Sequence, residues 1–375
     1  MEHTRELPLA PMEEWLRDRY FTAEIDISAS GVEPYSLGEV RRIVGLDQEE
    51  LDRLVFQDGH SYGDPEVRRL IAERWGNGDP NQVMTTNGSS EAIFLVLTSL
   101  LRPGDEVVVV EPGYHSLIHL AATIGCKVKP WRIDDPETVF AASLDALDEL
   151  VTDQTRAVIV SFPHNPTGIS LSEADLHRLL DRAAAVGAWV VWDAAFNDIT
   201  YDAPPLPNVV SLYERALSFG TFSKSFGMPG LRFGWCISPD SVLRTCVRVR
   251  DYVTLHLSPL VELVARRSLE NLDALLKPRL DQARHNRELL ARWAQAHGDD
   301  VSLALPAGGV AAFPRLDRVE DVDALAARLI DEHNVLVIPG SCFDRPRHVR
   351  LGFGGPTDEL VEGLARLDRV LADLT

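Results

Sequence analysis

The chain has 375 residues and 45% of them are hydrophobic, so it is long enough for two domains and apolar enough to bury a sizeable core. Its 57 acidic and 37 basic side chains give a formal net charge of -20 at pH 7. A surface of this sign repels the phosphate backbone of nucleic acids, which argues against nucleic-acid binding, and it weakly attracts cationic ligands.

Residues 1–49 show no clear helical or strand periodicity, and they contain a polar loop at 27–36. We expect this segment to pack on a smaller domain and to send its loop toward a cleft. The N-terminus is charged and lacks the apolar run of a signal peptide, and no window reaches the length of a membrane span. We therefore expect a cytoplasmic protein.

The middle of the chain alternates short apolar runs with amphipathic segments. Strands are predicted at 106–111, 157–162, 189–193 and 216–220, and helices at 87–97 and 171–187. Continuous apolar runs are typical of strands that are buried on both faces. Their alternation with helices predicts an α/β fold with a mainly parallel sheet flanked by helices.

The pattern changes after residue 270, where residues 273–297 predict one long amphipathic helix. Weaker strand signals follow it, at 310–316, 335–340 and 348–353. We therefore predict a large domain at 50–270 and a smaller α+β domain formed by 1–49 and 271–375. The four cysteines are scattered and include no CxxC pair, so they indicate neither a disulfide framework nor a zinc site, and no metal is expected.

Ligands of parallel sheets bind beyond the carboxyl ends of the strands, so the residues that follow each strand carry the most information. Gly88, Ser89 and Ser90 open a helix, and the free N–H groups at such a helix start can hold an anion, although this signal is weak by itself. Tyr114 follows the strand at 106–111 and can stack on a flat ring, or simply pack in the core.

Two further polar residues lie at strand ends. Asn165 lies in the turn PHNPTG, between two prolines, and is placed to offer its amide. Asp193 ends the apolar strand at 189–193, where a buried carboxylate is costly unless a cation pairs with it. That cation is either a protonated ring nitrogen or a structural ion-pair partner.

The stretch TFSKSFGMPGLRFGW places Lys224 and Arg232 in apolar company after another strand. A partly desolvated lysine has a lowered pKa and can form a Schiff base with an aldehyde, while an arginine can hold a phosphate dianion. Lys224, Arg232, the helix start at Gly88, Asp193 and Tyr114 together meet the needs of pyridoxal 5'-phosphate (PLP). In this assignment Asp193 keeps the pyridine nitrogen protonated, so that the ring can accept electrons.

These motifs, in this order and spacing, resemble the fold-type I PLP-dependent enzymes of the aspartate aminotransferase superfamily over nearly the whole chain. The resemblance implies that 50–270 is the PLP-binding domain, that Lys224 is the Schiff-base lysine and proton shuttle, and that Asn165 donates to the ring O3'. It also implies that Arg350 receives the substrate α-carboxylate and that the enzyme is a homodimer with shared active sites. The implied phosphate site consists of Gly88, Ser89, Ser90, Thr221, Ser223 and Arg232.

Two positions depart from the pattern of that superfamily. Phe196 stands where transaminases usually have a tyrosine that donates to O3', so the electronics of the cofactor should differ. Asp58 stands where many relatives have a tyrosine that reaches the phosphate of the neighbouring subunit. Because a carboxylate facing a phosphate is unfavourable, we expect Asp58 to face the substrate and to hold a cationic side chain.

The departures, together with stretches such as SASGVEPYS and RDYVTLHLSPLVE, resemble the capreomycidine synthases and their relatives in guanidino-antibiotic biosynthesis. This resemblance implies a lyase that cyclises 3-hydroxy-L-arginine: Lys224 removes the Cα proton, the β-hydroxyl leaves, and the guanidine adds to the β-carbon. The loop residue Gly31 is expected near the substrate. The candidates for placing the guanidine are Ser28, Ser30, Glu33, Asp58 and His164.

Two other functions stay open at this point. An ordinary aminotransferase acting on a basic or aromatic amino acid would share the cofactor residues. A regulatory protein that uses this fold as a ligand sensor would need a basic DNA-binding domain ahead of it, which this acidic chain does not show.

Overall fold

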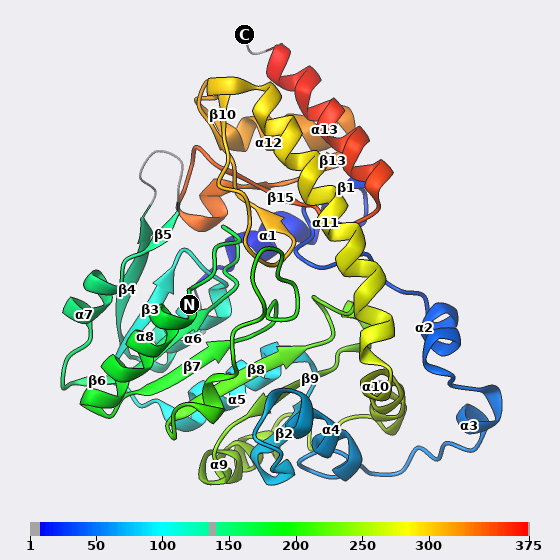
Figure 1. Cartoon of the computed structure of the whole chain (residues 1–375), viewed down its shortest axis with the longest axis vertical. Helices are drawn as coiled ribbons and strands as arrows, with labels where there is room; N and C mark the ends of the chain where they lie inside the picture. The colour runs from blue at the N-terminus through cyan, green and yellow to red at the C-terminus, as the bar shows by residue number, and fades with distance from the viewer. Residues whose placement is uncertain (1–7, 135–139, 374–375) are drawn as a thin grey trace, which may run out of the picture.

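The structure is a computed structural model that describes residues 8–134 and 140–373. A central sheet covered by helices forms the lower part of the molecule in Figure 1, and the C-terminal elements form a second unit above it. The long helix α11 (Leu272–Ala296) reaches from that upper unit down to α10 (Pro259–Glu270) beside the sheet. An α/β fold of the kind predicted is therefore confirmed.

The central sheet has the strand order β2-β9-β8-β7-β6-β3-β4-β5 in the described residues. Its strands are β2 (Val83–Thr86), β3 (Glu106–Glu111), β4 (Lys127–Asp134), β5 (Ala141–Ala142), β6 (Thr155–Ser161), β7 (Trp189–Asp193), β8 (Ala216–Thr221) and β9 (Gly234–Ile237). The strands from β8 through β4 are parallel to one another, whereas β2, β9 and β5 pair antiparallel. The carboxyl ends of β6, β7 and β8 therefore lie at one edge.

The apolar runs predicted from the sequence are buried on both faces because successive side chains alternate across the sheet. In β3, Val108 and Val110 pack in one core with α7 (Leu144–Leu150) and α8 (Glu173–Val186). Val107 and Val109 pack in a second core on the opposite face. The helices of that face are α5 (Gly88–Leu100), α6 (His115–Ile124) and α9 (Asp240–Arg250).

The second unit surrounds α11 with two further helices, α12 (Val322–His333) and α13 (Thr357–Ala372), and with short strands. The strands are β10 (Val301–Ser302), β11 (Ala311–Ala312), β12 (Arg315–Leu316), β13 (Val335–Leu336), β14 (Ile338–Pro339) and β15 (Val349–Gly352). The predicted strand at 310–316 is thus split in two, because Pro314 has no N–H to continue the ladder. From the N-terminus, β1 (Ile25–Asp26) pairs in parallel with β13 of this unit.

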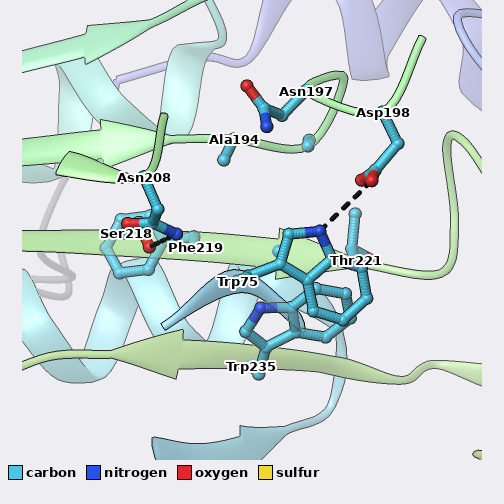
Figure 2. A pocket seen from close by; sticks show the side chains of 11 residues that line it. Trp75, Ala194, Asn197, Asp198, Asn208, Ser218, Phe219, Thr221 and Trp235 are labelled. Atoms are coloured by element: carbon cyan, nitrogen blue, oxygen red, sulfur yellow. Dashed lines mark hydrogen bonds between the residues drawn. The ribbon is translucent and has the colours of Figure 1, made fainter. Parts of the chain in front are cut away.

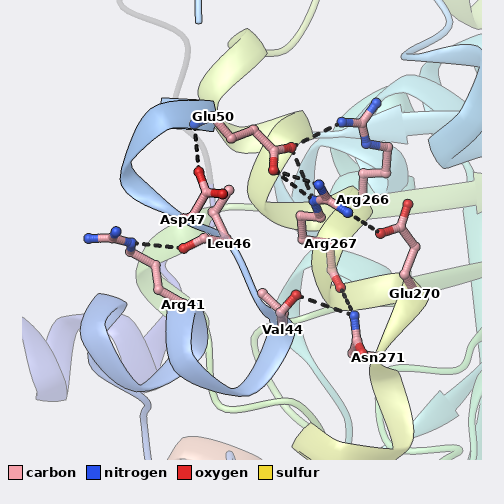
Figure 3. Close-up of polar contacts among 9 residues, drawn as sticks. All are labelled: Arg41, Val44, Leu46, Asp47, Glu50, Arg266, Arg267, Glu270 and Asn271. Carbon is pink, nitrogen blue, oxygen red and sulfur yellow. Dashed lines mark hydrogen bonds and ion pairs between the residues drawn. The ribbon is translucent and has the colours of Figure 1, made fainter. Parts of the chain in front are cut away.

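The helices at 37–52 contact elements of both units. Val40 and Val44 of α2 (Leu37–Val44) are buried in one core with residues of α4 (Pro65–Trp75) and α10, although α2 also contacts α11. In α3 (Gln48–Asp52), Glu50 accepts hydrogen bonds from the guanidinium groups of Arg266 and Arg267 in α10 (Figure 3). The domain boundaries stay a prediction. Residues 37–52 contact α10, which lies before the predicted boundary at 270, and α11, which lies after it.

At the N-terminal end of the described chain, α1 (Pro11–Arg17) lies against the second unit, where the indole N–H of Trp15 donates to the Val337 carbonyl at 2.8 Å. Across residues 8–134 and 140–373, no helix is both long and apolar enough to cross a lipid bilayer.

Candidate active site

A cleft opens at the carboxyl ends of β6, β7 and β8 and is walled on its other side by the N-terminal segment and the second unit. It encloses about 1640 Å³ including the space at its open mouth. The cleft brings together the following residues that the sequence predicted for the site: Ser28, Ser30, Gly31, Glu33, Ser89, Ser90, Tyr114, Asn165, Asp193, Phe196, Thr221, Ser223, Lys224, Arg232 and Arg350.

Asp193 and Lys224 are two ionisable groups whose environment favours their neutral forms. The side chain of Asp193 accepts the Ala195 N–H at 3.0 Å, and burial raises its pKa to about 6. Burial also lowers the pKa of Lys224 to about 8, with the positive charge of Arg350 acting in the same direction. The Lys224 amine donates to Ser30 Oγ at 2.9 Å. A lysine with a lowered pKa in the same cleft as a buried carboxylate is suited to nucleophilic and proton-transfer chemistry.

The start of α5 and Arg232 form a cradle for an anion. Gly88 has φ +74°, and a Cβ built on it would lie 2.4 Å from Arg232 Nη2, so this position accommodates only glycine without displacement. Arg232 Nη1 donates to Ser223 Oγ at 3.3 Å, and Thr221 Oγ1 lies 3.0 Å from the same hydroxyl. These donors converge beside the N-terminus of α5, which is an arrangement suited to a phosphate group.

Arg350 of β15 is a buried cation with a spare donor. It is 2% exposed, and its guanidinium donates to Asn165 Oδ1 at 3.2 Å and to the Ser28 carbonyl at 2.8 Å. Burial lowers the pKa of Arg350 to about 10. Its Nε has no hydrogen-bond partner in the part of the chain that the structure describes. A buried guanidinium that lines a cleft and has an unsatisfied N–H is suited to binding a carboxylate.

Two aromatic side chains complete the walls of the cleft. Tyr114 precedes α6, and its hydroxyl lies 3.4 Å from Ser90 Oγ. Phe196 is buried three residues after Asp193 and brings no hydroxyl into the cleft. A ring bound between these walls would therefore receive no hydrogen bond from position 196.

Three predicted residues do not line this cleft. Gly88 lies directly behind it, against Arg232. His164 is fully engaged by the protein, with Nδ1 2.7 Å from Thr167 Oγ1 and Nε2 2.6 Å from the Pro112 carbonyl. Burial lowers its pKa to about 4, so the neutral ring is favoured. The prediction that His164 binds substrate is wrong, because neither ring nitrogen is left to contact a ligand.

Asp58 is also absent from the cleft of its own chain. Its side chain is fully exposed and lies 3.1 Å from His256 Nε2. The expectation that Asp58 faces the substrate therefore does not hold within a single chain. Asp58 would face a substrate only in the cleft of a second subunit.

The sequence reasoning missed the contribution of α1 and α13. Met12, Glu13 and Leu16 line the cleft from α1, and Glu359 lines it from the first turn of α13. A usable signal was the i, i+4 spacing of Met12 and Leu16 in an otherwise charged segment, which indicates a short amphipathic helix.

A smaller cavity lies beside the main cleft and shares Ala195 and Thr221 with it. Figure 2 shows that its wall includes the stacked rings of Trp75 and Trp235, whose centroids are 4.5 Å apart. The Trp75 indole donates to Asp198 Oδ1 at 3.2 Å, and burial raises the pKa of Asp198 to about 6. This contact ties the segment after Asp193 to α4, so we interpret the cavity as part of the support of the site.

Comparisons with known proteins agree with this geometry. Residues 37–367 match the family "aminotransferase class I and II". The chain is 48% identical to capreomycidine synthase of Streptomyces vinaceus over 367 residues, which cover 97% of this chain and 94% of the relative. It is 28% identical to arginine–pyruvate transaminase AruH of Pseudomonas aeruginosa, with 82% of this chain and 80% of the relative covered.

Solved structures give the same result. The structure of the PLP-dependent cyclase OrfR in complex with Au matches with a TM-score of 0.94 and 41% identity, covering 100% of this chain and 99% of the other. A PLP-dependent aminotransferase from Streptococcus suis 89-1591 matches with a TM-score of 0.94 and 26% identity, covering 99% of each chain. The chain belongs to the aminotransferase class I and II family.

Proposed function

We propose that this protein is a PLP-dependent cyclase that converts 3-hydroxy-L-arginine to capreomycidine by loss of water and intramolecular addition of the guanidine. The observation that carries this proposal is the 48% identity with capreomycidine synthase over 97% of the chain. The match with the PLP-dependent cyclase OrfR supports the same class of reaction.

The residues of the cleft fit PLP. Lys224 is the amine for the aldehyde, and its lowered pKa favours the nucleophilic neutral form. The cradle of Thr221, Ser223 and Arg232 at the start of α5 suits the phosphate. Asp193, whose pKa burial raises to about 6, gains a partner when a protonated ring nitrogen faces it. When bound, PLP supplies an electron sink that stabilises negative charge at the substrate Cα.

The remaining residues orient the amino acid and move its proton. The guanidinium of Arg350, which lines the cleft, would receive the α-carboxylate and fix the substrate at one end. Lys224 is the base that takes the Cα proton and later returns it. Over the whole reaction the C–O bond at the β-carbon is replaced by a C–N bond to the guanidine, and one water leaves. No keto acid is consumed.

An aminotransferase is the second candidate, since the chain is also 28% identical to an arginine–pyruvate transaminase. Phe196 favours the cyclase, because it removes a hydroxyl that transaminases of the superfamily usually place against the cofactor ring. Fewer hydrogen bonds to the ring oxygen change the electronic properties of the cofactor, and those properties decide which bond at the substrate breaks.

We further propose a cytoplasmic homodimer with shared active sites. Apolar side chains are exposed on two adjacent segments, which the contact between Asp58 and His256 holds together. They are Val55, Phe56, Tyr252, Val253 and Leu255, all more than half exposed. An apolar patch of this kind favours burial against a second copy, and Asp58 at its edge would then approach the partner's cleft.

The two candidate reactions are separated by incubating the holoenzyme with 3-hydroxy-L-arginine without keto acid and analysing the product by mass spectrometry. The cyclase yields a product lighter by one water that keeps its α-amino group. Product formation only after a keto acid is added, with a ketone released, would support the aminotransferase. The Lys224→Ala variant should give no product and, in the absence of amino acid, no absorbance from an imine between PLP and the enzyme, since it lacks the amine that both reactions use.

A further inference from the structure

Besides Asp193, four carboxylates line the cleft, and they differ in whether the protein already uses them. They are Glu13, Asp26, Glu33 and Glu359. Asp26 Oδ1 accepts hydrogen bonds from both the N–H and the hydroxyl of Ser28, at 2.7 and 2.6 Å. Asp26 is therefore occupied in holding the loop that follows β1.

Glu33 and Glu359 are occupied as well. Glu33 forms an ion pair with Arg279 at 2.9 Å and accepts a hydrogen bond from Gln282 at 2.8 Å. Burial and the neighbouring charges of Asp358 and Asp26 raise the pKa of Glu359, while the backbone N–H of Asp26 stabilises its anion. Of these four carboxylates, Glu13 alone has neither a hydrogen bond nor an ion pair with any residue in the described ranges 8–134 and 140–373.

Glu13 lines the cleft from α1, a helix that is fixed beside Arg350. Its helix is anchored on one side by the hydrogen bond from Trp15 to Val337, and on the other by Met12, whose Sδ lies 3.1 Å from Arg350 Nη1. The negative charge of Glu13 acts on Lys224, on Arg350 and on the His115 ring, in each case opposing the lowering of the pKa by burial. The unpaired carboxylate therefore lies within electrostatic reach of the two cations that are assigned to the amino-acid backbone of the substrate.

A second observation shows that this end of the cleft is built for a ligand. Arg350 is 2% exposed, yet its Nε has no hydrogen-bond partner in the described chain. The buried cation Arg350 suits the α-carboxylate, and an unused carboxylate that lines the same cleft suits a cation. A ligand that satisfies both is an amino acid with a positively charged side chain that folds back over its own backbone.

We propose that Glu13 is the specificity-determining residue that binds the guanidinium group of the substrate and holds it over the β-carbon. This inference rests on the proposed function and deepens it, because a guanidine held in this position is prepared to close the ring. It assigns to α1 the role that the sequence suggested for Asp58.

The test measures binding to the holoenzyme rather than turnover. L-arginine has no β-hydroxyl to lose, and L-norleucine has an unbranched side chain that carries no charge. The two are titrated calorimetrically and by the absorbance of the cofactor. For Glu13→Gln we expect L-arginine to bind about 10- to 100-fold more weakly, as for loss of a hydrogen bond between charged groups, with L-norleucine within about twofold of wild type. Glu14→Gln is the matched control, because Glu14 is the next residue, is exposed and pairs only with Arg17 among the described residues.

Each other outcome overturns the proposal. Equal weakening of both ligands by Glu13→Gln would show a structural role of α1. An unchanged arginine affinity, or an equal loss in Glu14→Gln, would remove the specific role of Glu13. A selective loss of arginine binding in Asp58→Asn but not in Glu13→Gln would assign the guanidinium to Asp58 of a second subunit. Failure of the proposed function gives a different signal from failure of this inference. An aminotransferase slowly loses its yellow absorbance with L-arginine, whatever its relative affinity for L-arginine and L-norleucine.

Discussion

Replacing Gly88 by alanine should weaken PLP binding without unfolding the protein. Gly88 has φ +74°, a conformation that costs an L-residue about 1–2 kcal/mol. The new Cβ would lie 2.4 Å from Arg232 Nη2, whereas ordinary contacts begin near 3.4 Å, so the guanidinium must move by about 1 Å. A shift of this size breaks one charge-assisted hydrogen bond to the phosphate, which is worth about 1.5–3 kcal/mol. We therefore expect the Kd for PLP to rise about 10- to 100-fold.

The assay is a titration of the cofactor-free protein with PLP, followed by absorbance. Gly230→Ala is the control, because Gly230 lies two residues from Arg232 and a Cβ there meets nothing within 4 Å. Thermal unfolding of both cofactor-free variants measures the backbone strain by itself, because no phosphate contact contributes to their stability. If Gly88→Ala binds PLP as tightly as wild type, or if Gly230→Ala loses as much, the assignment of this cradle to the phosphate is refuted.

Two further predictions concern the buried carboxylate and the exposed apolar patch. Burial raises the pKa of Asp193 from 3.8 to about 6 in the folded, cofactor-free protein. Between these two pH values the folded state holds a proton that the unfolded state releases, so the free energy of unfolding falls as the pH rises from about 4 to about 6. Asp193→Asn should remove this pH dependence and stabilise the cofactor-free protein at pH 7 by about 1–3 kcal/mol, while weakening PLP binding. Chemical unfolding at pH 4 and pH 7 measures the free energy of unfolding, and a variant that is no more stable than wild type at pH 7 would contradict the prediction. Phe56→Glu should weaken a two-fold dimer by at least about 100-fold, since burying one phenylalanine contributes about 1.5 kcal/mol or more from each subunit. Analytical ultracentrifugation tests this against Leu305→Glu, another exposed apolar position outside the patch, and an undiminished dimer would place the interface elsewhere.

The sequence by itself determined the sheet and the residues at its edge. Apolar runs such as 106–111 and 189–193 are short and continuous, which indicates strands that are buried on both faces. Parallel strands bring their carboxyl ends to one edge, so Asn165, Asp193 and Lys224 meet without any knowledge of loop conformation. These positions were predictable because each depends on a local pattern and on one rule of sheet geometry.

Only the tertiary structure decided which polar side chains are free to bind a ligand. Glu13 and Arg350 are far apart in the sequence, and they share a cleft because Trp15 docks α1 on Val337. His164 adjoins the predicted Asn165, yet Thr167 and Pro112 use both of its nitrogens. The availability of a donor or a charge depends on every group that packs around it, including groups distant in sequence, and a linear pattern does not carry that information.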